Sequence, residues 1–144
     1  IHRIAAARRN LSRLMEFAQN KRRDGKTLFQ DPTIRNTLTQ LAIEAEAARL
    51  LAIRIVWMQS VGKAVDYEAS MSRVFGAEFQ QRVAQAGLQI TGAFGQLDEG
   101  SEWAPLSGFF QRQYLYAAAA TVGAGTAEIQ RNIIALRGLG LPRS

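Results

Sequence analysis

Apolar residues recur every three or four positions along residues 32–62, and this pattern constrains the fold more than any other feature. The steps alternate between four and three residues, so the pattern repeats every seven, at Ile34, Leu38, Leu41, Ala45, Ala48, Ala52 and Ile55. A repeat of this length is typical of a long helix that packs along other helices in a bundle. Asp31 and Pro32 fit the N-cap and first helical position, so the helix is expected to begin there and to end near Gly62.

Two further helices are expected on either side of this one. The first covers about residues 2–22, ends at Asp24 and Gly25, and buries the stripe Ile4, Ala7, Leu11, Leu14 and Ala18. The next begins at Asp66, the expected N-cap, and its inner face consists of Met71, Phe75, Phe79, Val83, Ala86 and Ile90. A loop punctuated by glycine follows, from Gly92 to Gly100.

The last part of the chain predicts a fourth helix from Pro105 through the alanines at 117–120, and a short fifth helix over about residues 126–137. The three prolines stand at expected helix ends, strand alternation is scarce, and no linker divides the chain. The 144 residues are therefore expected to form one domain, residues 1–144. The predicted fold is all-α, an antiparallel four-helix bundle with a short C-terminal fifth helix.

Composition excludes several kinds of site. The chain has no cysteine and one histidine, His2, so neither a disulfide framework nor a metal centre that needs several imidazoles is expected. No Glu-x-x-His pair, no Gly-x-Ser-x-Gly turn and no apolar run of about 20 residues is present, so neither a di-iron bundle nor a membrane span is expected. The main carboxylates are expected on solvated helix surface: Glu16, Glu44, Glu46, Glu68 and Glu78. Trp57 and Trp103 are expected to be packing or interface residues.

The net charge is +6, and the basic residues cluster at positions 8–9 and 21–23, with Lys26 close by. A basic helical nucleic-acid binder is one hypothesis, but no aromatic residues interleave with the clusters and no known motif appears. No nucleic-acid partner is therefore expected, and a phosphate-rich small molecule suits the second cluster better. No signal peptide is visible, which favours a cytoplasmic protein, and the start at Ile1 indicates a fragment.

The last 22 residues offer a candidate site. Gly125 and Thr126 open an apolar-periodic helix, arginine and glycine close it, and a proline stands just past its end. A helix start presents free backbone N–H groups and a positive dipole end, which can hold an anion such as a diphosphate. An ordinary helix cap is the alternative on these residues alone. Gln89, just before the glycine loop, is likewise either a surface amide or a ligand contact.

Four stretches stand out in order: the basic helix end with Gly25, Gln89-Ile90-Thr91-Gly92, Gly125-Thr126-Ala127-Glu128-Ile129-Gln130-Arg131, and Leu139-Gly140-Leu141-Pro142-Arg143. Together they resemble the C-terminal helical domain of the acyl-CoA dehydrogenase family, and the similarity covers essentially the whole chain. The Asp-Pro helix start and the Leu-Gly-Leu-Pro-Arg ending resemble the branch that includes sterol side-chain acyl-CoA dehydrogenases. Complete members have two further domains upstream, so this chain would be the last third.

The resemblance implies an FAD-dependent flavoprotein, an oxidoreductase of lipid metabolism that oxidises acyl-CoA thioesters to 2,3-enoyl-CoA. In such enzymes a carboxylate takes the α-proton while hydride passes from the β-carbon to the flavin. The C-terminal bundle builds the tetramer core and contributes to FAD sites shared between subunits. The implied partners are an acyl-CoA substrate and either identical or related subunits. The fragment alone is expected to be inactive.

The same resemblance assigns the cofactor contacts. Gln89 and Gly92 would lie near FAD bound to a neighbouring subunit, whereas the start of the last helix would approach FAD directly. Lys21 stands where the family usually has an arginine on the diphosphate, so the charge is kept but the bidentate fork is lost. Asp24 replaces a usual aromatic and Ala93 a usual glycine. The expected cofactor-binding residues are Lys21, Gln89, Gly92, Gly125, Thr126 and Glu128.

Ala124 is the largest departure from the family pattern. Many members carry the catalytic glutamate at this position, and alanine cannot take a proton. No catalytic residue is therefore assigned within the chain, and three explanations stay open. In the first, a residue upstream of Ile1 supplies the base. In the second, the protein is a non-catalytic subunit that pairs with an active one, and in the third the dehydrogenase chemistry has been lost. A purely structural bundle that serves as an oligomerisation partner is the alternative to the enzyme.

Overall fold

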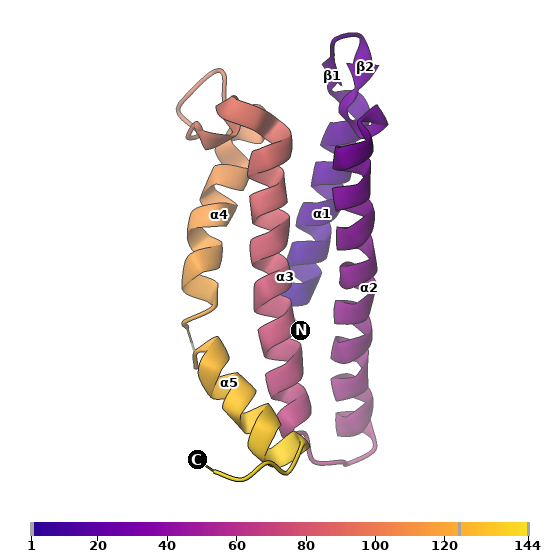
Figure 1. The fold of residues 1–144 in the computed structure, drawn as a ribbon, viewed down its shortest axis with the longest axis vertical. Coiled ribbons are helices and arrows are strands. Elements are labelled where there is room, and N and C mark those ends of the chain that lie inside the picture. Colours follow the sequence, from indigo (N-terminus) through magenta and orange to yellow (C-terminus); the bar gives the residue numbers. More distant parts are fainter. Residues whose placement is uncertain (1, 124, 144) are drawn as a thin grey trace.

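The computed structural model describes residues 2–123 and 125–143. Four long helices run up and down beside one another, and a short fifth helix closes one end (Figure 1). The helices are α1 (His2–Asn20), α2 (Pro32–Ser60), α3 (Tyr67–Thr91), α4 (Phe109–Ala120) and α5 (Ala127–Ile133). The chain leaves α5 through one π-helical turn, η4 (Ile134–Gly138). The predicted all-α bundle with a short fifth helix is confirmed.

The core lies between α1, α2 and α3, with α4 packed on α3. The predicted stripes of α1 and α2 are buried, and Leu14, Leu38 and Phe79 are fully buried. The prediction for α3 is wrong at Met71, which is 36% exposed. The first half of α3 contacts α5 and η4 as well as α2, and the residues it buries there are small or polar rather than a regular apolar stripe: Glu68, Ser70, Ser72 and Gly76.

The two predicted aspartate caps behave differently. The Asp31 carboxylate accepts hydrogen bonds from the backbone N–H groups of Thr33 (2.8 Å) and Ile34 (3.3 Å), as expected of an N-cap. Asp66 precedes α3 but its side chain caps no backbone N–H. Its Oδ1 instead accepts from the Arg137 guanidinium at 2.7 Å, so the capping prediction is wrong and the carboxylate serves a tertiary ion pair.

A short β-hairpin replaces the predicted last turn of the first helix. Its strands are β1 (Arg22–Arg23) and β2 (Lys26–Thr27), and α1 stops at Asn20. Asp24 and Gly25 both have positive φ, 52° and 78°. Two such residues form the turn that matches the twist of a two-residue hairpin, and Asp-Gly is a favoured sequence for it. Gly25 is therefore a hairpin turn residue rather than a helix stop.

The connection between α3 and α4 contains two 3-10 turns, η2 (Gly92–Gln96) and η3 (Pro105–Gly108). Leu106, Ser107 and Gly108 are all left-handed, so α4 begins at Phe109 and not at Pro105. A Cβ on Gly108 would lie 2.7 Å from the backbone N of Glu99, which explains glycine there. Within the described ranges, no helix has the length and apolarity needed to span a membrane.

Candidate functional site

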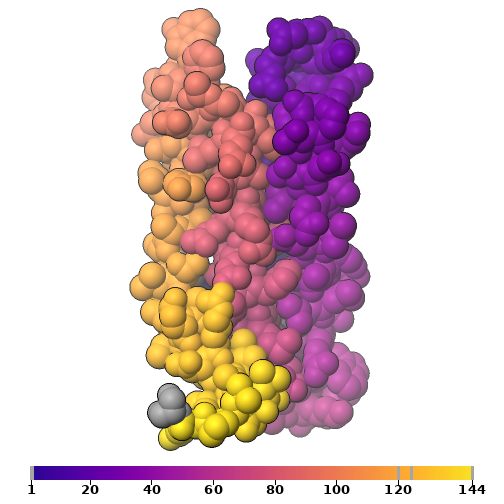
Figure 2. Space-filling model, in the orientation of Figure 1, coloured from indigo at the N-terminus to yellow at the C-terminus, as the bar shows by residue number. Residues whose placement is uncertain are grey.

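The hairpin end of the bundle carries a groove. Figure 2 shows the molecule hollowed between the hairpin and the end of the bundle where α3 meets α4. The groove has a volume of about 530 Å³, and its lining includes Phe17, Lys21, Arg22, Arg23, Phe94 and Trp103. Phe94 and Trp103 contact each other with ring centroids 6.5 Å apart, although both side chains are largely exposed. The groove therefore combines apolar walls with a row of cations.

Lys21 is the most available of these cations. Arg22 donates to the Gly25 carbonyl at 3.0 Å, and Arg23 lies 3.7 Å from the Asp31 carboxylate. Within residues 2–123 and 125–143, Lys21 is exposed and pairs with no carboxylate, although Glu102 also lines the groove. A lysine ammonium in this state can pair with an anionic ligand as a point charge.

Gln89 and Gly92 lie at the same end of the bundle but in a different groove. That groove has a volume of about 550 Å³, and Gln96, Gln111 and Tyr114 also line it. Gly92 ends α3 with φ of 72°, a conformation that glycine adopts without strain, and a Cβ there would meet nothing within 4 Å. The structure therefore brings Gln89 and Gly92 together and keeps Lys21 apart from them.

The start of α5 is capped from within. The Thr126 hydroxyl accepts from the backbone N–H of Ile129 at 3.4 Å. Glu128 is exposed, and a hydrogen bond from its own backbone N–H, followed by one from the Thr126 hydroxyl, lowers the pKa of its carboxyl. Glu128 is therefore charged at neutral pH and occupies donors that an anionic ligand would use. The start of α5 suits an uncharged polar partner better than a diphosphate.

The two groups of predicted contacts are far apart in one chain. Arg73 of α3 donates a hydrogen bond to the Gly125 carbonyl, and Gln89 lies sixteen residues after Arg73 in α3. A helix rises about 1.5 Å per residue, so the two positions are separated by roughly 24 Å along α3. The predicted contacts therefore form two separate sites in one chain, one at Gln89 and Gly92 and the other at Thr126 and Glu128. Ala124, the expected position of the missing base, lies outside the described residues.

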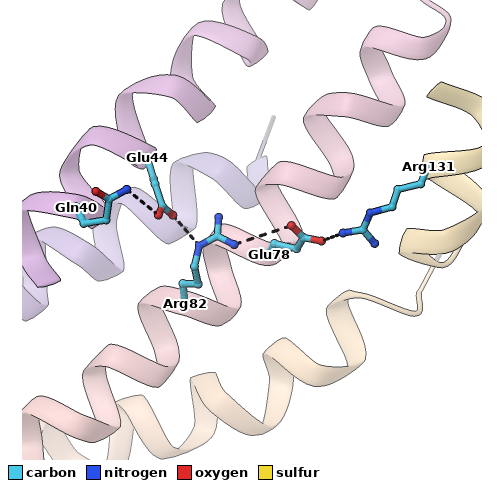
Figure 3. Close-up of polar contacts among 5 residues, drawn as sticks. All are labelled: Gln40, Glu44, Glu78, Arg82 and Arg131. Carbon is cyan, nitrogen blue, oxygen red and sulfur yellow. Dashed lines mark hydrogen bonds and ion pairs between the residues drawn. The ribbon is translucent and has the colours of Figure 1, made fainter. Parts of the chain in front are cut away.

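A polar network that the sequence did not predict ties α5 to the bundle (Figure 3). Arg131 of α5 pairs with Glu78 of α3, Glu78 also lies 3.9 Å from Arg82, and Arg82 donates to Glu44 of α2 at 2.7 Å. Gln40 donates to the other oxygen of Glu44 at 3.3 Å. Two four-residue spacings were the visible signals, Glu78 with Arg82 on α3 and Gln40 with Glu44 on α2, since each places its pair on one helix face.

The expected solvated surface is wrong for two carboxylates. The Glu44 side chain is 18% exposed because it pairs with Arg82 across the helices. Glu68 is 8% exposed, and its carboxyl pairs with Arg54 at 3.2 Å. The pKa of the Glu68 carboxyl is lowered, mainly because the backbone N–H of Glu68 donates a hydrogen bond to it. Burial acts in the opposite direction and raises this pKa. Both are structural ion pairs between helices.

The outer surface of the bundle is apolar in places. Five large side chains of α2 are roughly half exposed: Ile43, Leu50, Ile53, Val56 and Trp57. Tyr114, Leu115 and Tyr116 of α4 are also exposed. Trp57 therefore does not pack in the core of a single chain. Across the part of the chain that the structure describes, no group of three or more His, Cys, Asp or Glu side chains could hold a metal ion.

Comparison with known proteins identifies the family. The chain matches the family model "Acyl-CoA dehydrogenase, C-terminal domain" over residues 1–139, and it belongs to this family. It is 30% identical over 138 residues to the acyl-CoA dehydrogenase FadE26 of Mycobacterium tuberculosis, which covers 93% of this chain and 34% of that protein. The resemblance inferred from the C-terminal signature is confirmed.

Solved structures agree with this assignment. The ChsE4-ChsE5 complex from Mycobacterium tuberculosis superimposes with a TM-score of 0.90 at 29% identity, covering 98% of this chain and 37% of that chain. The Tcur3481-Tcur3483 steroid ACAD gives a TM-score of 0.86 at 25% identity, covering 96% of this chain and 35% of that chain. The chain spans about a third of the length of these relatives.

Proposed function

We propose that the intact protein is an FAD-dependent acyl-CoA dehydrogenase that introduces a 2,3 double bond into an acyl-CoA thioester. Membership of the acyl-CoA dehydrogenase C-terminal family over residues 1–139 is the observation that carries the proposal. The chain spans about a third of its relatives' length, so the activity is proposed for the intact protein and not for this domain alone. The bound FAD would supply the hydride acceptor.

The residues of this domain would serve two flavins in an oligomer. Lys21 would neutralise the diphosphate of one flavin from its own groove. Gln89 would hydrogen-bond a polar edge of that flavin where the ligand extends into the second groove, beside the open backbone at Gly92. Thr126 and Glu128, roughly 24 Å away along α3, would approach a second flavin. The charges of the two sites support this division. The cation Lys21, which suits a diphosphate, lies at the hairpin end, and the negatively charged Glu128, which does not, lies at α5.

The oligomer would cover the apolar outer faces of the bundle. Half-exposed side chains of α2 and α4 form such faces, and large exposed apolar patches mark interaction surfaces. Two solved relatives are assemblies of two different proteins, ChsE4-ChsE5 and Tcur3481-Tcur3483, and the second is described as a steroid ACAD. A related second subunit and a steroid-derived acyl group follow as proposals for this protein, which we place in the cytoplasm.

A second candidate function is a non-catalytic partner subunit. Ala124 favours it, because alanine at the usual base position cannot take the α-proton. Such a subunit would contribute flavin contacts and oligomer surface to an active relative. An assay of the intact protein without a partner distinguishes the two candidates. The enzyme would oxidise acyl-CoA and reduce a flavin-linked dye by itself, whereas the partner subunit would show this activity only with its active relative.

Flavin content tests the proposal. The purified intact protein should be yellow and show a flavin absorption band. After the flavin is removed, added FAD should restore that band. Lys21→Gln should weaken FAD binding about tenfold, because it removes the available cation. Lys26→Gln is the matched control, since Lys26 is exposed on β2 but does not line the groove. A colourless intact protein that binds no added FAD would refute the proposal.

A further inference from the structure

The α5–η4 segment (residues 127–138), named the C-terminal segment, is attached without a buried core. Neither α5 nor η4 contains a buried residue, and Ile129 is 53% exposed. Burial of apolar side chains is what usually fixes a short helix, because seven residues alone are not stably helical. Ile133, Ile134 and Leu136 are only partly buried, so polar contacts must add to apolar packing to hold this segment on α3.

Arg73 of α3 makes the contacts that fix the start of the segment. Its Nε and Nη2 atoms donate to the Gly125 carbonyl at 3.3 Å and 3.1 Å, and Nη2 also donates to the Gly123 carbonyl. The Arg73 side chain is half-buried, which strengthens charge-assisted hydrogen bonds. Gly125 immediately precedes Thr126, so Arg73 sets the position of the residue that caps α5.

Two more arginine pairs hold the rest of the segment. Arg131 pairs with Glu78, which the neighbouring Arg82 links to α2, as Figure 3 shows. Arg137 donates to Asp66 at 2.7 Å, at the beginning of α3. All three guanidinium contacts connect the segment or its entrance to α3. At the entrance of α5, the position of Thr126 and Glu128 relative to the bundle therefore depends on polar contacts.

We propose that Arg73 is a positioning residue for the flavin contacts at Thr126 and Glu128. It touches neither the flavin nor the substrate, and it acts by holding the carbonyl groups that lead into α5. Its loss frees the entrance of α5 while the core of α1, α2 and α3 stays folded. The part of this inference that concerns flavin rests on the proposed function, whereas the attachment of the segment does not.

Amide hydrogen exchange and FAD titration of the intact protein test the inference together. Arg73→Gln should raise exchange of amides in residues 126–133 about tenfold or more, because it removes three charge-assisted hydrogen bonds. Arg73→Lys should restore part of the protection. The matched control is Arg49→Gln, which breaks an exposed ion pair with Glu46 on α2 (2.9 Å and 3.0 Å) far from the segment and should leave its exchange unchanged.

The FAD affinity of the same variants decides the functional part. Arg73→Gln should weaken FAD binding at least fivefold with unchanged exchange in α2, and Arg49→Gln should not. Unchanged exchange in Arg73→Gln would overturn the inference, as would faster exchange with full FAD affinity. Absence of FAD binding by the wild type would instead refute the proposed function, while the exchange data still decide the attachment. If Arg73→Gln fails to fold, Glu78→Gln replaces it, with the same direction expected.

Discussion

The body of the bundle and the C-terminal segment differ in what holds them. Along α1 and α2, every predicted stripe residue is buried, and the largest fully buried side chains include Leu14, Leu38 and Phe79. In α5 and η4 no residue is buried, and guanidinium groups connect the segment to α3. The segment that holds the proposed flavin contacts is thus attached by weaker and more local interactions than the scaffold beside it.

Truncation of apolar side chains should separate the two regions most strongly. Leu38→Ala should lower the free energy of unfolding by about 2–5 kcal/mol, because Leu38 is fully buried and a cavity would remain. Ile129→Ala should lower it by less than about 0.5 kcal/mol, because Ile129 is half exposed. Urea unfolding of the intact protein measures both. Equal losses would contradict the distinction.

A methyl group added inside the scaffold should also be costly. A Cβ on Gly87 would lie 2.1 Å from the ring of Phe110, which is 1% exposed and cannot move aside. Gly87→Ala should therefore lower the free energy of unfolding by about 1–3 kcal/mol. Gly100→Ala is the control, since a Cβ there meets nothing within 4 Å. Comparable thermal unfolding of the two variants would show that α3 and α4 are less closely packed than described.

Removal of an ion pair should act mainly on the C-terminal segment. Glu78→Gln should lower the local opening free energy of α5 by about 0.2–1 kcal/mol, because the pair with Arg131 is partly exposed and screened. Amide exchange in α5 reports this, and the difference from wild type should shrink in high salt. Glu99→Gln, which breaks the pair with Arg112, serves as control. An effect spread through α1 and α2 would contradict a local attachment.

Acid should weaken the scaffold through Glu68. Its pKa is lowered in the folded protein from the ordinary 4.5, so its stabilising contribution is complete above pH 4.5 and disappears as the pH falls through the folded pKa. Glu68→Gln should therefore flatten the fall of Tm between pH 7 and acid, whereas Glu16→Gln on exposed α1 should keep the wild-type curve. Parallel curves for wild type and Glu68→Gln would contradict this linkage.

The scaffold was predictable because its signal is local and repeated. The seven-residue pattern of α2 corresponds to one buried stripe, and Asp31 caps the helix as its sequence indicates. The hairpin was missed although Asp24-Gly25 is a strong turn signal, because the preceding helical pattern outweighed it. Asp66 was assigned as a cap because no sequence pattern shows that Arg137, 71 residues away, competes for it.

The candidate site was predictable only in part. The signature around Thr126 identified the family and the cap of α5, and both are confirmed. The roles of Lys21, Gln89 and Glu128 stay predictions, since they depend on a ligand and on other subunits. Arg73 carried no signal, because its guanidinium bonds to backbone carbonyls about 50 residues away, and any residue type provides a carbonyl. Contacts of this kind follow from the fold and not from residue identity.

Flavin-dependent protection of backbone amides in the intact protein tests the central claim most directly. Exchange is compared with and without FAD over the whole chain. We predict that FAD slows exchange at residues 89–92 and at residues 125–131, the two separate places, and leaves the buried face of α2 unchanged. No change at either place, or protection confined to α2, would contradict the account.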